Sequence, residues 1–135
     1  KCYPIYPFEN HKPMKILIAE DEPIMLKTME LKLKRDGHQV ITANNGRDAI
    51  QLLTENDIDL VITDIMMPYT SGLEILGHVK KNGGKKIPVI VLSAMGQENV
   101  VIEAFSLGAD DYITKPFSPN ELSLRVMRFA ASVAA

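Results

Sequence analysis

The feature that most constrains the fold is a regular alternation of short apolar runs with longer amphipathic stretches, which occurs five times after Met14. The apolar runs are rich in Ile and Val, so we expect each to be a strand buried on both faces of a sheet. They comprise residues 15–19, 39–43, 60–63, 88–92 and 111–113. Parallel strands joined by right-handed helical crossovers carry helices on both faces. The sequence therefore predicts an α/β fold with a doubly wound, five-stranded parallel sheet and five helices, because a closed barrel needs about eight units.

The amphipathic stretches carry helix signals. Pro23 suits the first turn of a helix, and Gly37 suits its end. Further helices are predicted over residues 46–55, 71–81, 97–107 and 118 to about 131, with Gly83, Gly84 and Gly108 as helix terminators. In open sheets of this kind, ligands bind outside the carboxyl ends of the strands. Functional residues are therefore expected at those strand ends.

Charge and composition exclude several classes of protein. The chain has 15 Lys and Arg against 17 Asp and Glu, a net charge of −2, which is too balanced for direct nucleic-acid binding through phosphates. No apolar run approaches the roughly 18 residues of a membrane-spanning helix, so no membrane contact is expected. The single cysteine, Cys2, can form no internal disulfide, and Pro4 and Pro7 interrupt any apolar signal segment. These features favour a reducing, cytoplasmic setting.

The length of 135 residues fits one domain. Residues 1–13 contain three prolines and follow neither the helical nor the strand period, whereas Met14 begins the first apolar run as a start codon would. We interpret residues 1–13 as a cloning remnant or linker and residues 14–135 as the folded domain. Because the chain stops near the end of the last predicted helix, we expect either a stand-alone protein or a domain of a longer one.

Charged and hydroxyl residues gather where the predicted strands end. Glu20 and Asp21 follow the first strand, and Asp64 follows the third. Ser93 follows the fourth strand, and Lys115 comes after the fifth. If these strands lie side by side, the carboxylates converge and repel one another, which raises their pKa values unless a cation compensates them. Mg²⁺ prefers oxygen ligands and keeps bound waters, so an open acidic site of this kind suits it.

The same residues suit phosphoryl chemistry. The Asp64 carboxylate could attack an activated phosphorus, and Lys115, Ser93 and Mg²⁺ would meet the charge on the transferred group. Each residue also has an ordinary explanation, such as an acidic helix start, a turn aspartate or a solvated lysine. The conjunction of four elements at one end of the sheet favours the functional interpretation.

Four segments resemble the receiver domain of bacterial two-component response regulators. They are Glu20-Asp21, DIMMP with Asp64, Ser93-Ala94, and GADDYITKPF over residues 108–117. The resemblance covers Met14 to about Ala131 without an obvious gap. It implies a flavodoxin-like sheet with the strand order 2-1-3-4-5.

The resemblance also implies roles for the site residues. Asp64 is expected to be the phosphoacceptor, and Lys115 is expected to contact the phosphoryl group. Glu20 and Asp21 are expected to hold Mg²⁺ together with Asp64 and the backbone carbonyl of Met66. Glu20 stands where aspartate is commoner in the family, and its longer side chain can still reach the ion.

Ser93 and Tyr112 match the family's switch pair. In that pair the hydroxyl moves toward the phosphoryl oxygen and the aromatic ring turns inward, which changes the face of helix four, strand five and helix five. Tyr112 is equally consistent with an aromatic residue packed in an edge strand. The resemblance further implies a cis peptide bond before Pro116, which would aim Lys115 into the site.

By this resemblance the chain is a phosphoacceptor signalling domain of a phosphorelay, and it catalyses only its own phosphorylation and dephosphorylation. A histidine kinase or histidine phosphotransfer protein would donate the phosphoryl group, and an effector domain or downstream protein would respond. The alternative is a non-phosphorylated pseudo-receiver that serves as a docking module. A haloacid-dehalogenase-type phosphatase would need an acid where Met66 stands, and a flavin carrier would need a phosphate loop where Glu20 and Asp21 stand.

Two methionines bear on the lifetime of an acyl phosphate. Met66 and Met95 lie two residues beyond Asp64 and Ser93, and in the family these positions flank the route of attacking water. Neither side chain offers a base or a hydrogen bond that would orient the water. Slow hydrolysis is therefore expected.

A phosphorylation-dependent dimer is expected to be weak. Asp111 and Arg125 match one charge pair of the family's dimers, but Glu121 lacks a basic partner because Val101 stands at that position. Exposed ion pairs contribute only about 0–1 kcal/mol, so the loss affects the choice of partner more than affinity. Val100 and Val101 would form a small apolar patch if they face solvent.

Overall fold

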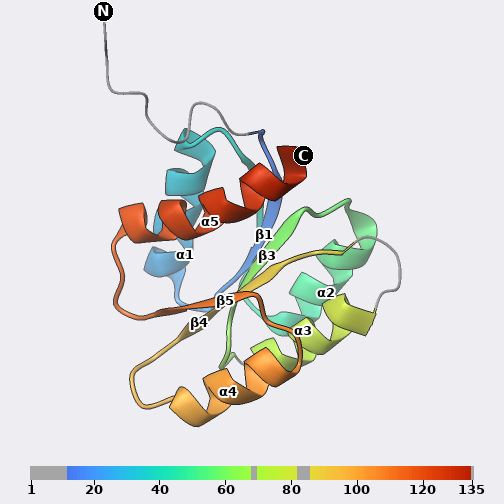
Figure 1. The fold of residues 1–135 in the computed structure, drawn as a ribbon, viewed down its shortest axis with the longest axis vertical. Coiled ribbons are helices and arrows are strands. Elements are labelled where there is room, and N and C mark those ends of the chain that lie inside the picture. The colour runs from blue at the N-terminus through green and yellow to red at the C-terminus, as the bar shows by residue number, and fades with distance from the viewer. Residues whose placement is uncertain (1–11, 68–69, 82–85, 135) are drawn as a thin grey trace, which may run out of the picture.

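The computed structural model describes residues 12–67, 70–81 and 86–134, and within them five strands alternate with five helices (Figure 1). The strands are β1 (Lys15–Ala19), β2 (Gln39–Ala43), β3 (Leu60–Asp64), β4 (Val89–Ser93) and β5 (Asp111–Thr114). The helices are α1 (Pro23–Arg35), α2 (Gly46–Glu55), α3 (Gly72–Lys81), α4 (Glu98–Ser106) and α5 (Pro119–Ala134). Gly83 and Gly84 lie outside the described residues, and the interpretation of residues 1–13 as a remnant or linker stays a prediction.

The elements lie where the sequence predicts them, with ends that differ by a few residues at most. β4 begins and ends one residue later than predicted, because Pro88 has no N–H to donate and stands just before the strand. The Pro88 carbonyl still accepts the N–H of Val61 at 3.0 Å. The shift places Ser93 inside β4, paired with Thr114 of β5.

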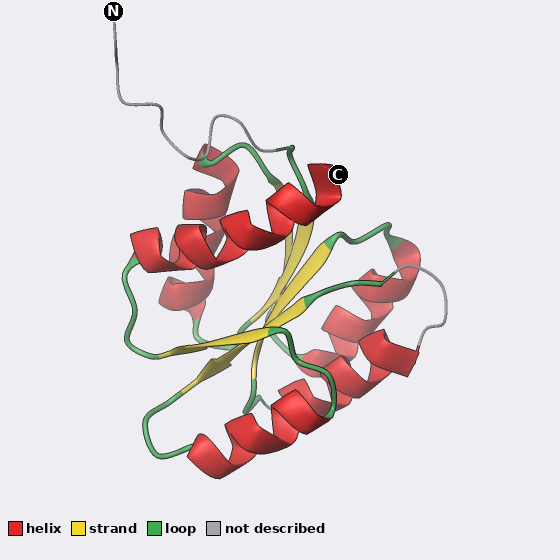
Figure 2. Ribbon diagram, viewed as in Figure 1, coloured by secondary structure: helices red, strands yellow, loops and turns green. Residues whose placement is uncertain are grey.

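The strands form one parallel sheet in the order β2-β1-β3-β4-β5, so the doubly wound fold and the implied order are confirmed. Figure 2 shows helices on both sides of the central strands. α1 and α5 pack on one face, and α2, α3 and α4 pack on the other. In this order β1, β3, β4 and β5 are consecutive neighbours, so their carboxyl ends meet at one edge of the sheet.

The expectation that every strand is buried on both faces holds for the three central strands only. β3 and β4 are buried at every residue, and β1 is buried at all but Lys15. β2 and β5 are the edges of the sheet, and the prediction is wrong for them because the helices cover the edges incompletely. On β5, Tyr112 and Thr114 are exposed while Asp111 and Ile113 are buried.

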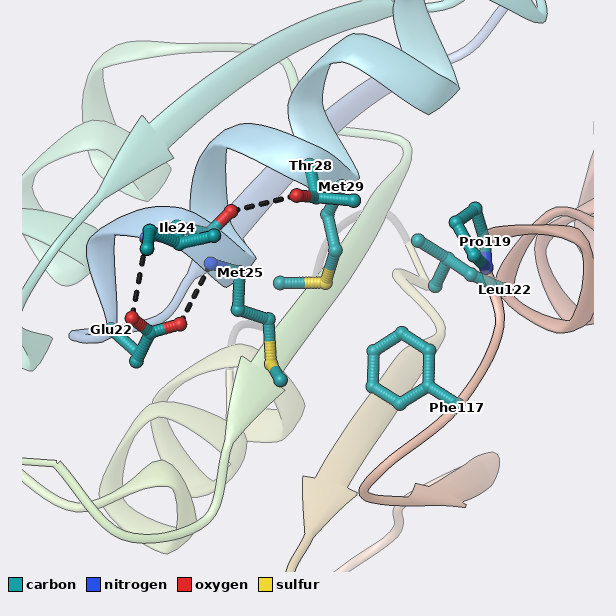
Figure 3. Close-up of a pocket in the computed structure, with 8 residues that line it drawn as sticks. All are labelled: Glu22, Ile24, Met25, Thr28, Met29, Phe117, Pro119 and Leu122. Atoms are coloured by element: carbon teal, nitrogen blue, oxygen red, sulfur yellow. Dashed lines mark hydrogen bonds between the residues drawn. The ribbon is translucent and has the colours of Figure 1, made fainter.

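The start of α1 gives a structural role to Glu22, the acidic residue that follows Glu20 and Asp21. Glu22 is the N-cap of α1, and its carboxylate accepts the N–H groups of Ile24 at 3.3 Å and Met25 at 2.8 Å (Figure 3). Pro23 occupies the first turn, as predicted. Gly37 and Gly108 adopt φ of 101° and 109°, which suits their predicted role after helix ends. No helix among the described residues is long and apolar enough to cross a membrane.

Candidate functional site

Three carboxylates meet at the carboxyl edge of the sheet. Glu20 directly follows β1 and Asp64 ends the neighbouring β3, so their side chains come together with that of Asp21. One carboxylate oxygen from each lies within 4.8 Å of the others. Glu20 is fully buried and Asp64 is 6% exposed, whereas Asp21 is exposed. Glu20 and Asp64 therefore form the buried part of the cluster, and Asp21 lies on its solvent-exposed side. The carboxylates converge at the strand ends, as the sequence predicted.

Lys115 joins the two buried acids. Its ammonium nitrogen lies 2.8 Å from Glu20 Oε1 and 2.7 Å from Asp64 Oδ2. The Lys115–Pro116 peptide bond is cis, and the Lys115 N–H donates to the Ser93 carbonyl at 2.7 Å. Burial by itself would lower the pKa of Lys115, but the contacts with Asp64 and Glu20 outweigh it and raise the pKa above its usual value. The lysine therefore stays an ammonium ion at neutral pH.

The Glu20 carboxyl group is the most perturbed acid of the cluster. Burial raises the pKa of Glu20 to about 7, with a further rise from Asp64, although Lys115 and the Glu22 N–H oppose the shift. The predicted rise is thus confirmed for Glu20, but its main cause is burial and not repulsion between carboxylates. Within the chain, the cation that pairs with Glu20 and Asp64 is Lys115.

One oxygen of Glu20 is well placed for a cation. Oε2 accepts the Glu22 N–H at 3.0 Å. Oε1 is buried and, apart from the ion pair with Lys115, has no hydrogen bond of acceptable geometry among the described residues. A buried carboxylate oxygen without a hydrogen bond, beside two further carboxylates, is the donor set that a hard divalent cation prefers. The site therefore fits the predicted Mg²⁺.

The backbone around Asp64 is held from several sides. Asp64 Oδ1 accepts the Met66 N–H at 3.3 Å, and the Thr63 hydroxyl donates to the Asp64 carbonyl at 3.0 Å. Gly72, the first residue of α3, approaches this carbonyl so closely that a Cβ atom on it would lie 2.1 Å from the oxygen. The role of the Met66 carbonyl as a metal ligand stays a prediction.

Gly72 is a supporting residue that the sequence reasoning missed. Its N–H donates to the Ile65 carbonyl at 2.8 Å, which ties the start of α3 to the residue after Asp64. The signal was available, since a glycine stood at the second position of the helix predicted over residues 71–81, which closely follows the central aspartate. Glycine at that position lets two backbone segments pack without a side chain between them.

The predicted switch residues line one groove. Ser93 is 2% exposed at the end of β4, and Tyr112 is 41% exposed on β5. The Tyr112 ring packs edge-on against Phe105 of α4, with ring centres 5.8 Å apart and planes at 89°. Ser93, Phe105 and Tyr112 all line a hollow between α4 and β5. In this structure the partly exposed tyrosine and the buried serine therefore line the same groove.

A second hollow lies between α1 and α5 and is mainly apolar (Figure 3). Met25 and Met29 of α1 face Phe117 and Leu122 across it. None of the three clustered carboxylates lines this hollow. The chemistry suggested by the acidic cluster is therefore not located in the apolar hollow.

The charge pair expected across a dimer is used within the chain. Asp111 is 6% exposed, and its two oxygens each lie 2.9 Å from an arginine of α5, Oδ1 from Arg125 and Oδ2 from Arg128. Val100 and Val101, which were expected to form an apolar patch only if they face solvent, are both partly buried against the core. The exposed apolar residues of α4 are Ile102 and Phe105, at 67% and 43%.

The strand order and the acidic cluster together define a flavodoxin-like α/β domain with a carboxylate-lined edge. The chain belongs to the family of response regulator receiver domains, whose family model matches residues 16–127. The response regulator SaeR of Staphylococcus aureus (strain USA300) is 43% identical over 111 residues, which are 82% of this chain and 48% of SaeR. The chain thus spans about half the length of the curated relatives it matches.

Solved receiver domains share the fold. The Francisella response regulator 1452 receiver domain is 34% identical, with a TM-score of 0.81 over 89% of this chain and 98% of that one. A response regulator receiver domain protein from Clostridium thermocellum is also 34% identical, with a TM-score of 0.82 over 90% and 97% of the two chains. The family predicted from the motifs, a receiver domain of two-component signalling, is therefore confirmed.

Proposed function

We propose that this receiver domain accepts a phosphoryl group on Asp64 and thereby changes the face formed by α4, β5 and α5. The observation that carries the proposal is the contact of Lys115 with both Asp64 and Glu20 inside a cluster of three carboxylates. A nucleophilic carboxylate with a fixed cation beside it is suited to attack a negatively charged phosphoryl group.

The transfer step conserves atoms and electrons. One Asp64 oxygen forms a bond to phosphorus, and the bond from phosphorus to the donor atom breaks, with its electron pair leaving on the donor. The Lys115 ammonium, already 2.7 Å from Asp64 Oδ2, faces the negative charge of the phosphoryl oxygens. The Met66 N–H contact with Oδ1 holds the carboxylate in place. Hydrolysis by water later regenerates Asp64, so the domain catalyses only its own phosphorylation and dephosphorylation.

Magnesium is the cofactor of this proposal. Glu20, Asp21 and Asp64 would hold the ion, together with the Met66 carbonyl, and the buried Glu20 Oε1 supports this assignment. When bound, Mg²⁺ neutralises charge on the phosphoryl oxygens. Lys115 contacts Glu20 and Asp64, two of these three acids. Its ion pair with Glu20 would weaken once a bound Mg²⁺ neutralises part of the charge of that carboxylate.

The response follows from the groove between α4 and β5. The Ser93 hydroxyl would turn toward a phosphoryl oxygen, and the Tyr112 ring would move into the groove that both residues line. The ring would then leave its edge-on contact with Phe105 and alter the exposed surface of α4. Because Asp111 is already paired with Arg125 and Arg128 in the same chain, any phosphorylation-dependent dimer is weak.

The partners follow from the family. A histidine kinase or a histidine phosphotransfer protein donates the phosphoryl group in the cytoplasm, and an effector domain or downstream protein reads the altered face. A non-phosphorylated pseudo-receiver is not favoured, because the nucleophile, both further acids and the lysine are all present.

Intact mass measurement tests the proposal. The protein is incubated with acetyl phosphate and Mg²⁺, and a gain of one phosphoryl mass is expected. Asp64→Asn should gain none, and chelation of Mg²⁺ should abolish the gain in the wild type. Asp48→Asn serves as a control, since Asp48 is an exposed residue of α2 and should behave as the wild type. Equal yield in Asp64→Asn, or yield unaffected by chelation, contradicts the proposal.

A further inference from the structure

The two methionines with exposed side chains each lie two residues after a residue of the proposed site, Asp64 or Ser93. All seven methionines lie in the described residues: Met14 and Met29 are buried, Met25, Met67 and Met127 are partly buried, and Met66 and Met95 are exposed. The exposed pair has 57% and 80% of its surface accessible, against 1% for each buried methionine. An exposed thioether is open to oxidants, whereas a packed one is shielded by its neighbours.

Both exposed methionines stand beside residues of the phosphorylation site. Met66 follows Asp64 by two residues, and its N–H donates to Asp64 Oδ1 at 3.3 Å. Met95 follows Ser93 by two residues, in the loop between β4 and α4. This loop is held by the Ala94 N–H, which donates to Gln97 Oε1 at 2.7 Å. Both methionines therefore lie in segments held by backbone hydrogen bonds, each two residues from a residue of the proposed phosphorylation site.

We propose that Met66 and Met95 are sites of oxidation by peroxides, and that their sulfoxides shorten the lifetime of the phosphorylated state. In the reaction, a sulfur lone pair forms a bond to one peroxide oxygen as the O–O bond breaks. The second oxygen leaves with the electron pair of that bond and takes up the proton of the sulfur-bound oxygen, which gives the sulfoxide and water, or an alcohol from an organic peroxide. Sulfur loses two electrons and the peroxide gains them, so no further reactant is needed.

The effect on lifetime rests on the proposed phosphorylation of Asp64. By the family resemblance these two positions flank the route of attacking water, and a thioether is a poor hydrogen-bond acceptor, so the pair would leave that water without a partner. A sulfoxide oxygen is a polar acceptor, so it can bind one hydrogen of a water while the water oxygen faces phosphorus. Orientation alone is weaker than full base catalysis, which contributes roughly 10²–10⁴-fold, so we expect about a two- to tenfold faster loss of phosphate.

Oxidation is mapped first, with no phosphoryl donor present. The background is Cys2→Ser, because Cys2 is the single thiol of the chain. After limited treatment with hydrogen peroxide, peptide mass analysis should find sulfoxide at Met66 and Met95 well before the other five methionines. Equal rates at all seven positions overturn the assignment of these two as the oxidation sites, whether or not Asp64 is ever phosphorylated.

Decay of the phosphoryl mass is then followed after removal of acetyl phosphate. Oxidised protein should lose phosphate faster, and treatment with methionine sulfoxide reductases should restore the slow decay. The double variant Met66→Leu, Met95→Leu should be insensitive to peroxide, while Met127→Leu should respond as the parent does. Met66→Asn, which introduces a polar acceptor without oxidation, should also decay faster.

The two proposals fail in different ways. Normal phosphorylation with a lifetime unchanged by oxidation overturns the effect proposed for the sulfoxides and leaves Asp64 as the phosphoacceptor. Failure of unoxidised protein to gain phosphoryl mass overturns the proposed function, and with it the effect on lifetime, but not the oxidation map.

Discussion

The ammonium nitrogen of Lys115 lies 2.7 Å from Oδ2 of Asp64, although the strands that precede these residues are separated by β4. The lysine side chain, which follows β5, therefore extends past the end of β4 to the carboxylate at the end of β3. Its second contact, with the fully buried Glu20, makes Lys115 the link between the ends of β1, β3 and β5.

Loss of this link is expected to destabilise the domain. In Lys115→Met, two buried carboxylates lose their cation, which costs roughly 1–3 kcal/mol of the free energy of unfolding. Urea denaturation at pH 8 with a chelator measures it. Lys27→Met is the control, since Lys27 is largely exposed and its ion pair with Glu30, at 3.5 Å, is a surface pair that contributes little to stability. Equal stability of the two variants would show that Lys115 contributes nothing to the fold.

Gly72 is expected to tolerate no side chain. A Cβ at this position would lie 2.1 Å from the Asp64 carbonyl oxygen, so Gly72→Ala must push α3 or the end of β3 aside. We expect a loss of about 2–4 kcal/mol, together with slower phosphorylation. Gly77→Ala is a matched control in the same helix, because nothing lies within 4 Å of its Cβ position. The control should be neutral or gain about 0.5–1 kcal/mol.

Movement of Tyr112 can be followed by fluorescence. The chain contains no tryptophan, so Tyr112→Trp introduces a single reporter on β5. Addition of Mg²⁺ and beryllofluoride, a phosphoryl mimic, should shift its emission to the blue as the ring leaves water for the groove. The same variant with Asp64→Asn should not respond. An unchanged spectrum, despite binding of the mimic detected by mass or calorimetry, would refute the inward rotation.

Self-association after activation is expected to remain weak. Asp111 already has an arginine on each oxygen, so it has little to offer a second copy of the chain. Sedimentation velocity with beryllofluoride should find mostly monomer at about 50 µM, which corresponds to roughly 6 kcal/mol or less of association free energy. A tight dimer that dissociates in Arg125→Glu but survives Ile102→Asp would show that the charge pair of Asp111 and Arg125 forms between two chains after all.

The sequence predicts the layout of the site better than its internal contacts. Short apolar runs followed by Glu20, Asp64 and Lys115 are enough to place these groups at one edge of a parallel sheet. Contacts that depend on distances between elements were not predictable in this way. The pairing of Asp111 with Arg125 and Arg128 requires the rotation of α5 against β5, which periodicity does not specify.

Burial at the sheet edges was also beyond the sequence pattern. Residues 111–113 were expected to be buried like a central strand, yet Tyr112 is 41% exposed because α4 and α5 leave part of this edge uncovered. The same applies to Val100 and Val101, where spacing alone did not distinguish the inner side of α4 from the outer one. Helix rotation follows from side-chain packing across the whole face, and a single sequence contains it only indirectly.

The hydrogen bond from the Lys115 N–H to the Ser93 carbonyl has a consequence for the order of events in time. It fixes the main chain at Ser93, which is also paired with Thr114 in the sheet, so the first motion open to Ser93 is a turn about one side-chain bond. Side-chain rotations belong to the fastest motions of proteins, whereas displacements of whole helices take microseconds to milliseconds. In the proposed switch we therefore expect the displacement of α4 to set the speed, while the serine side chain adjusts almost at once.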